Sequence, residues 1–195
     1  DGHNVAIGME AGVAMTTGIK NTLIGGQAGD ALTTGSGNVA IGFDALGAED
    51  AHGRNVAIGH LTLQSQNAGA DAYNTAVGYT AGIAVSTGVN NTLIGGLAGN
   101  ALTTGIRNVA VGYGALETED AHGFNTAIGW AALNSQDAGA DAYNTAIGYS
   151  AGLSVTTGVR NVIIGSIAGD ALTTGGYNIA IGYTALGSED TGAKN

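Results

Sequence analysis

The sequence predicts an all-β protein, a parallel β-solenoid (β-roll) of eleven coils. Two observations predict this fold class. An Asn-x-[Ala/Leu/Ile]-[Ile/Val]-Gly motif recurs eleven times, and the steps between successive motifs are 17, 17, 17 and 19, a series that then repeats. Self-similarity at a short fixed period is typical of solenoids, in which each unit buries its apolar side against its neighbours. The motif begins at Asn4, Asn21, Asn38, Asn55, Asn74, Asn91, Asn108, Asn125, Asn144, Asn161 and Asn178.

The first element expected in each unit, counted from its asparagine as position 1, is a strand over positions 1 to 4. A run such as Asn-Val-Ala-Ile is too short for a helix, and the glycine at position 5 of every unit would end one. Asparagine and glycine supply corners with positive φ. Each unit then divides into two or three such strands with turns, and equivalent residues stack about 4.8 Å apart.

Position 4 is expected to form the core of the stack, because it is Ile or Val in every unit. A close-packed interior demands a constant side-chain volume from coil to coil. The expected core residues are Ile7, Ile24, Ile41, Ile58, Val77, Ile94, Val111, Ile128, Ile147, Ile164 and Ile181.

The next elements lie around positions 9 and 12 of the unit. In some units the large apolar residue stands at position 9, and in the others it stands at position 12. Units with Gly at position 9, such as Gly82, have Met, Leu or Val at position 12. Units with Leu at position 9, such as Leu116, have Glu or Gln at position 12. One large apolar group is therefore kept in each unit, which indicates that both positions face a core or a chain–chain interface.

The whole chain, 1–195, is predicted to be a single repeat domain. Four units form a super-repeat, and the super-repeats span 4–73, 74–143 and an incomplete 144–195. Solenoids require polar caps at their ends, and none is evident in the sequence. We therefore expect the chain to be part of the shaft of a longer fibrous protein.

Positions 2, 3 and 4 are often all apolar, as in Val5-Ala6-Ile7. Adjacent strand residues point to opposite faces, so both faces of the strand are expected to be buried. A coil this thin cannot bury both by itself. The sequence thus predicts that the protein associates with further copies of itself.

Composition excludes several classes of protein. The chain has no cysteine, and 15 acidic residues against 5 basic ones give it a net charge of −10. That balance argues against nucleic acid or an anionic membrane as partner. No apolar run approaches the roughly 18 residues that a membrane-spanning helix needs. A loose dinucleotide-type glycine motif over residues 35–40 is not followed by a helix, and no cofactor is expected.

Acidic pairs recur once in each super-repeat, at Glu49-Asp50, Glu119-Asp120 and Glu189-Asp190. We interpret them as solvated corners, because an enzyme rarely repeats its active site along a rod. His52 and His122 are interpreted as lone corner residues. The sequence predicts no catalytic residue and hence a protein that is not an enzyme.

A calcium site is the metal hypothesis that the sequence raises. Asp71 and Asp141, with Asn67 and Asp137 nearby, offer the oxygen ligands that calcium prefers. The glycine-rich motif of calcium-binding solenoids is absent, so no metal is predicted.

Large side chains concentrate at two positions that bracket the strand. Every basic residue stands at the last position of a unit, and every aromatic residue stands there or at position 6. Stacked rings either line an oligomer seam or contact a sugar or receptor. The candidate receptor or interface residues are Tyr79, Tyr113, Trp130, Tyr149 and Tyr183.

These motifs resemble two related families of repeats. Asn144 to Tyr149, Asn-Thr-Ala-Ile-Gly-Tyr, resembles the head repeats of YadA-like trimeric autotransporter adhesins. Residues 157–161 and 178–186 resemble the shaft repeats of phage tail fibres, which the long spacing between asparagines favours. The resemblance covers the whole chain. It implies a homotrimer of left-handed β-rolls, displayed outside a cell or on a virion, that acts in attachment.

The expected function is therefore that of a structural and adhesive shaft of a viral tail fibre. The alternative is the head of a bacterial adhesin, and the expected partners are the chain itself and a host-surface glycan or receptor. An ice-binding solenoid is a further alternative, because Thr-Thr pairs such as Thr33-Thr34 recur. The third and fourth units of each complete super-repeat lack the pair, which breaks the regular array that ice binding needs.

Overall fold

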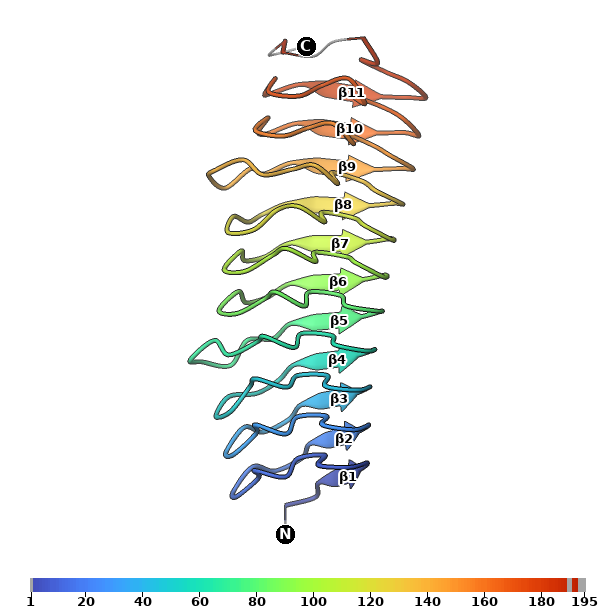
Figure 1. The fold of residues 1–195 in the computed structure, drawn as a ribbon. Helices are drawn as coiled ribbons and strands as arrows, with labels where there is room; N and C mark the ends of the chain where they lie inside the picture. The colour runs from blue at the N-terminus through green and yellow to red at the C-terminus, as the bar shows by residue number, and fades with distance from the viewer. Residues whose placement is uncertain (1, 189–190, 193–195) are drawn as a thin grey trace.

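The computed structural model describes residues 2–188 and 191–192. It confirms an all-β, parallel β-solenoid with one strand in each coil. The strands form one sheet in which each pairs with its neighbours in sequence, so that the coils stack into a rod (Figure 1). They are β1 (Val5–Ile7), β2 (Thr22–Ile24), β3 (Val39–Ile41), β4 (Val56–Ile58), β5 (Thr75–Val77), β6 (Thr92–Ile94), β7 (Val109–Val111), β8 (Thr126–Ile128), β9 (Thr145–Ile147), β10 (Val162–Ile164) and β11 (Ile179–Ile181).

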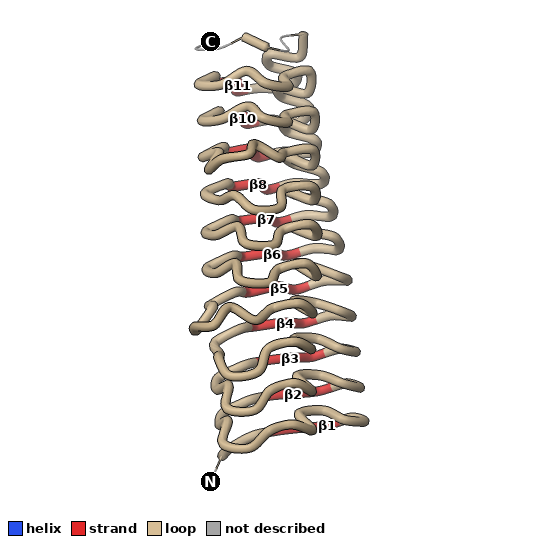
Figure 2. Tube along the Cα trace, turned by 60° about the vertical axis from the view of Figure 1, so that its left-hand side comes forward, coloured by secondary structure: helices blue, strands red, loops and turns tan. Residues whose placement is uncertain are grey.

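Each strand pairs with the next in the register of the repeat, as in Val109↔Thr126 between β7 and β8. The expectation of two or three strands per coil is wrong, because the rest of each described coil consists of turns and bends (Figure 2). The longer coils that follow β4 and β8 protrude furthest from the rod (Figure 1). Among the described residues we find no helix, and hence none of the length and apolarity required to cross a membrane.

The glycine at position 5 is required by close stacking. At Gly112 the backbone φ is +132°, a region that side chains rarely adopt. A Cβ atom at this residue would clash with the carbonyl oxygen of Gly129 in the next coil. Any larger residue here would therefore push two coils apart.

The asparagine at position 1 joins consecutive coils through a buried ladder. The Oδ1 atom of Asn91 accepts a hydrogen bond from the backbone N–H of Asn108 at 2.9 Å. Its Nδ2 atom donates to the carbonyl of Gly105, at position 15 of its own coil, at 2.9 Å. The Oδ1 bond recurs at 2.8–3.1 Å in every pair of neighbouring asparagines. A side chain that satisfies two backbone groups explains why no other residue occupies position 1.

Positions 3, 9 and 12 fill the interior, as predicted for the last two. Leu93 at position 3, Leu116 at position 9 and Leu102 at position 12 are fully buried. Gly82 and Gly99 make room for Leu93, since a Cβ at either glycine would collide with its methyl groups. The interior is therefore packed between coils as well as within them.

The prediction that position 4 forms the core of the coil is wrong. Position 3 points inward, and position 4 lies on the outer face of the sheet because side chains alternate along a strand. The affected residues, half-buried or exposed in the single chain, are Ile7, Ile24, Ile41, Ile58, Val77, Ile94, Val111, Ile128, Ile147, Ile164 and Ile181.

Candidate functional site

The outer face of the sheet is formed by positions 2 and 4 of β1–β11; position 4 is aliphatic throughout, whereas five of the eleven residues at position 2 are threonines. Position 2 carries Val, Thr or Ile, and position 4 carries Ile or Val. These side chains keep part of their surface in water, and Ile94 in the middle strand of the sheet, β6, remains 38% exposed. Because the strands are in register, the face forms two continuous files along the rod.

The position-6 ladder runs immediately after the strands. The five predicted contact residues Tyr79, Tyr113, Trp130, Tyr149 and Tyr183 are between 47% and 74% exposed in the single chain. The rings of Trp130 and Tyr149 stack with centroids 5.0 Å apart, and His60 stacks on Tyr79 at 5.4 Å. The structure brings these residues into one file, which small residues interrupt at Gly26, Gly96 and Ser166.

A second file, the corner ladder, occupies the last position of each unit just before the asparagine. The guanidinium of Arg107 lies over the ring of Phe124 at 5.3 Å, and Phe124 stacks on Tyr143 at 4.9 Å. Arg160 lies between Tyr143 and Tyr177, 5.5 and 5.4 Å from their centroids. Stacked cations and rings stabilise one another along the rod. Lys194, the last basic residue predicted for this position, lies outside the described residues.

Asp71 and Asp141 have structural partners in the longer loops. The Oδ1 atom of each accepts a backbone N–H, from Gly53 and Gly123 respectively, at 3.1 Å. Asp71 also forms an ion pair with Arg54, beside a shallow groove that Lys20 helps to line. These contacts explain both carboxylates as anchors of the loops.

The threonines of the Thr-Thr pairs also serve the stack. The hydroxyl of Thr33 donates to the carbonyl of Asp50 at 3.0 Å, and that of Thr103 donates to the carbonyl of Asp120 at 2.9 Å. Each bond joins one coil to the next. The hydroxyls of Thr33 and Thr103 are thus engaged with the protein main chain, which gives the ice-binding hypothesis no support.

The acidic corners differ from their interpretation as solvated pairs. Glu49 and Glu119 are fully buried, and the backbone N–H of His52 or His122 donates to the glutamate Oε1 at 3.1 or 3.2 Å. Burial raises the pKa of both carboxyls, while the hydrogen bond and the nearby imidazole oppose that shift. The corner at Glu189-Asp190 lies outside the described residues.

Sequence reasoning missed these interior carboxylates although a signal was present. Glu119 stands at position 12, where Leu102 and Val85 occupy the interior in other coils. Position 12 was inferred from this exchange to face a core or a chain–chain interface, yet its glutamates were interpreted separately, with the neighbouring aspartates, as solvated corners.

Comparison with family models, with curated proteins and with solved structures found no match for this chain.

Proposed function

We propose that this chain is the shaft of a self-associating attachment fibre, a structural protein rather than an enzyme. The observation that carries the proposal is the outer sheet face, where an unbroken aliphatic file at position 4 runs beside the valines, threonines and isoleucine of position 2, and these side chains stay partly open to water along the rod. Large exposed apolar patches are typical of protein interfaces. A second copy of the chain is the partner with a matching repeat. We propose three chains because the repeats resemble those of trimeric fibres.

The same resemblance suggests a fibre on a virion, as part of a tail fibre, or on a bacterial surface, as the head of an adhesin. In either setting a rod of stacked coils supplies length and stiffness. The exposed position-6 ladder then contacts a host glycan, because aromatic faces suit the apolar faces of sugars. Repetition along three chains converts weak contacts into firm adhesion. Nucleic acid and membrane play no part in this proposal.

Two substitutions on neighbouring residues of β8 test self-association. Ile128→Asp puts a charge on the outer sheet face, whereas Ala127→Asp puts one at a fully buried interior position. We expect I128D to fold but to sediment with the mass of a single chain, while the unmodified protein sediments at three times that mass. A127D should lose several kcal/mol of stability, because its charge is buried without a partner. An unmodified protein that sediments as a monomer contradicts the proposal.

Glycan contact is tested separately, with Tyr113, Trp130 and Tyr149 all replaced by alanine. Loss of adsorption to host cells or to a glycan array, with the sedimentation mass unchanged, supports the ladder as the contact surface. Loss of assembly instead assigns the rings to the seam between chains. Unchanged adsorption leaves the shaft as a spacer.

A further inference from the structure

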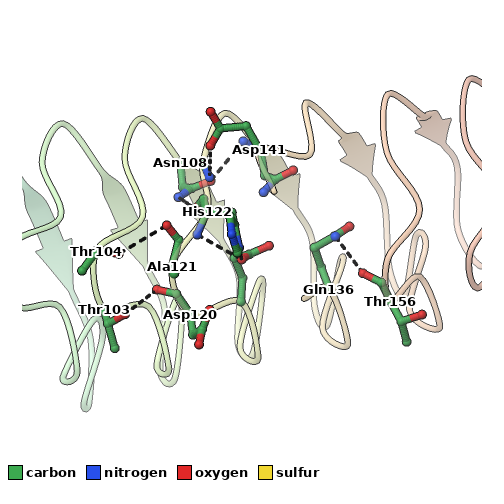
Figure 3. A network of polar contacts seen from close by, with 12 residues as sticks. Thr103, Thr104, Asn108, Asp120, Ala121, His122, Gln136, Asp141 and Thr156 are labelled. Carbon is green, nitrogen blue, oxygen red and sulfur yellow. Dashed lines mark hydrogen bonds and ion pairs between the residues drawn. The ribbon is translucent and has the colours of Figure 1, made fainter. Parts of the chain in front are cut away.

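The corner after β7 gathers four potential metal ligands from two consecutive coils. Glu119, Asp120 and His122 belong to the coil of β7, and Asp137 belongs to the coil of β8. One ligand atom of each lies within 4.8 Å of the others. Figure 3 shows His122 and Asp120 at this corner, with the Asp120 main chain tied to Thr103. The corner is therefore held by the same bonds that stack the coils.

The buried glutamate of this corner lacks a donor for one of its oxygens. Glu119 is 0% exposed, and its Oε2 atom has no hydrogen-bond partner among the described residues. The equivalent Oε2 of Glu49, and the Nδ1 of His52 beside it, are likewise buried without a hydrogen bond in the described part of the chain. A buried carboxylate oxygen is costly unless a donor or a cation faces it. The feature thus occurs in each of the first two super-repeats.

Glutamine at the same repeat position has no such deficit. The Oε1 of Gln136 accepts from Asn144 at 2.6 Å, and its Nε2 donates to the carbonyl of Thr156 at 2.8 Å. Gln66 makes the same two bonds with Asn74 and Ser86. The fold therefore accommodates a neutral polar group here with full hydrogen bonding. The glutamate at the corner with the histidine, in contrast, has a buried Oε2 atom that still needs a donor or a cation.

We propose that Glu119, Asp120, His122 and Asp137 bind a divalent transition-metal ion. An imidazole nitrogen with carboxylate oxygens suits zinc and its neighbours, whereas calcium and magnesium prefer oxygens alone. Ligands about 2.1 Å from a tetrahedral zinc lie about 3.4 Å apart. The Nδ1 of His122 and the Oε1 of Glu119 are 3.3 Å apart, a spacing that also allows a hydrogen bond between them when no ion is bound. Asp120 and Asp137 are exposed, which opens the site to solvent.

The first super-repeat contains an incomplete copy of this site. Glu49, Asp50 and His52 lie within 4.8 Å of one another, but Asn67 stands in the sequence where the complete site has Asp137. The Glu49 Oε1 and His52 Nδ1 atoms are also further apart, at 3.8 Å. This copy has one carboxylate fewer and is expected to bind the ion more weakly.

Calorimetric titration of the untagged full chain with zinc chloride tests the site. We expect one tight equivalent per chain and a rise in melting temperature with zinc, because an ion that binds only the folded state stabilises it. Asp137→Asn should weaken that equivalent at least tenfold and remove the thermal shift. Asn67→Asp should add a second equivalent of comparable affinity.

Asp141→Asn is the matched control, since Asp141 lies in the same coil as Asp137 but outside the cluster. It should leave the tight equivalent in place. Absence of saturable zinc binding overturns the proposal. Equal effects of D137N and D141N overturn it as well, because they would mean that the corner attracts cations by its charge alone.

Discussion

At the scale of the residue, the unusual feature is a carboxyl group in the interior of a thin coil. Glu49 is fully buried, and burial raises its pKa. The charges that act on it are the opposing imidazole of His52 and the carboxylate of Asp50, which raises the pKa further. A raised pKa means that the folded state binds the proton more tightly than the unfolded state does. The glutamate therefore costs the protein stability once the pH exceeds its ordinary pKa.

Glu49→Gln should accordingly stabilise the protein at pH 8 by about 1–3 kcal/mol, the scale of one desolvated buried group. At pH 4 the carboxyl is largely protonated in the folded state, so the gain should be much smaller. The sign follows from the raised pKa, whose penalty grows as pH rises and vanishes as pH falls. Urea denaturation at both values, with a chelator present, measures it. An equal gain at pH 4 and pH 8 would assign the effect to packing rather than charge.

At the scale of the element, the asparagine ladder sets how firmly one coil holds the next. Its members are not equivalent. Asn91 uses both polar atoms of its side chain, whereas Asn55 uses only Oδ1, which accepts from Asn74 at 3.1 Å. The Nδ2 of Asn55 is buried without a partner among the described residues, because its coil contains the longer loop.

Asn91→Ala should therefore cost more than Asn55→Ala. The first leaves two backbone groups unsatisfied, those of Asn108 and Gly105, at about 2–4 kcal/mol in total. The second leaves one, at about 1–2 kcal/mol. Urea midpoints rank the two variants, and hydrogen exchange of the Asn108 amide reports the local loss. Equal destabilisation would show that the Nδ2 bond contributes nothing measurable.

Much of this architecture could be predicted from the sequence, because the regular spacing of the asparagines determines coil length, stacking and register. The prediction of which strand residues face the interior of the coil was wrong. Constancy of Ile or Val at position 4 indicated a core, yet the buried asparagine at position 1 sets the alternation, which sends position 3 inward. The buried pairing of Glu119 with His122 could not be predicted, because it depends on the shape of a turn.

At the scale of the whole molecule, the four-coil super-repeat is a repeat of packing as well as of sequence. Leu93 of the β6 coil fills the space at Gly82, in the preceding coil of β5, and at Gly99 in its own coil. The next two coils carry alanine at position 3 and bury Leu116 and Leu133 from position 9. Coils with similar backbones therefore differ in which neighbouring coil can fill the space that their glycines leave.

Two deletions test whether the repeat that matters for stability is the single coil, which sets the backbone, or the four-coil super-repeat, which sets the side-chain packing. Removal of residues 74–143 joins Tyr73 to Asn144, which is equivalent to Asn74, and every coil keeps a neighbour of the accepted kind. Removal of residues 91–107 also preserves strand register but takes away Leu93, which leaves the space at Gly82 empty.

We expect the four-coil deletion to keep its melting temperature and to shorten the rod by about 19 Å, since each coil adds about 4.8 Å. The one-coil deletion should lose about 2–5 kcal/mol, as a buried leucine replaced by a void does. Thermal melting and small-angle scattering measure both variants. If the shorter deletion melts no earlier than the longer one, the coils are interchangeable, and the super-repeat has a cause other than packing.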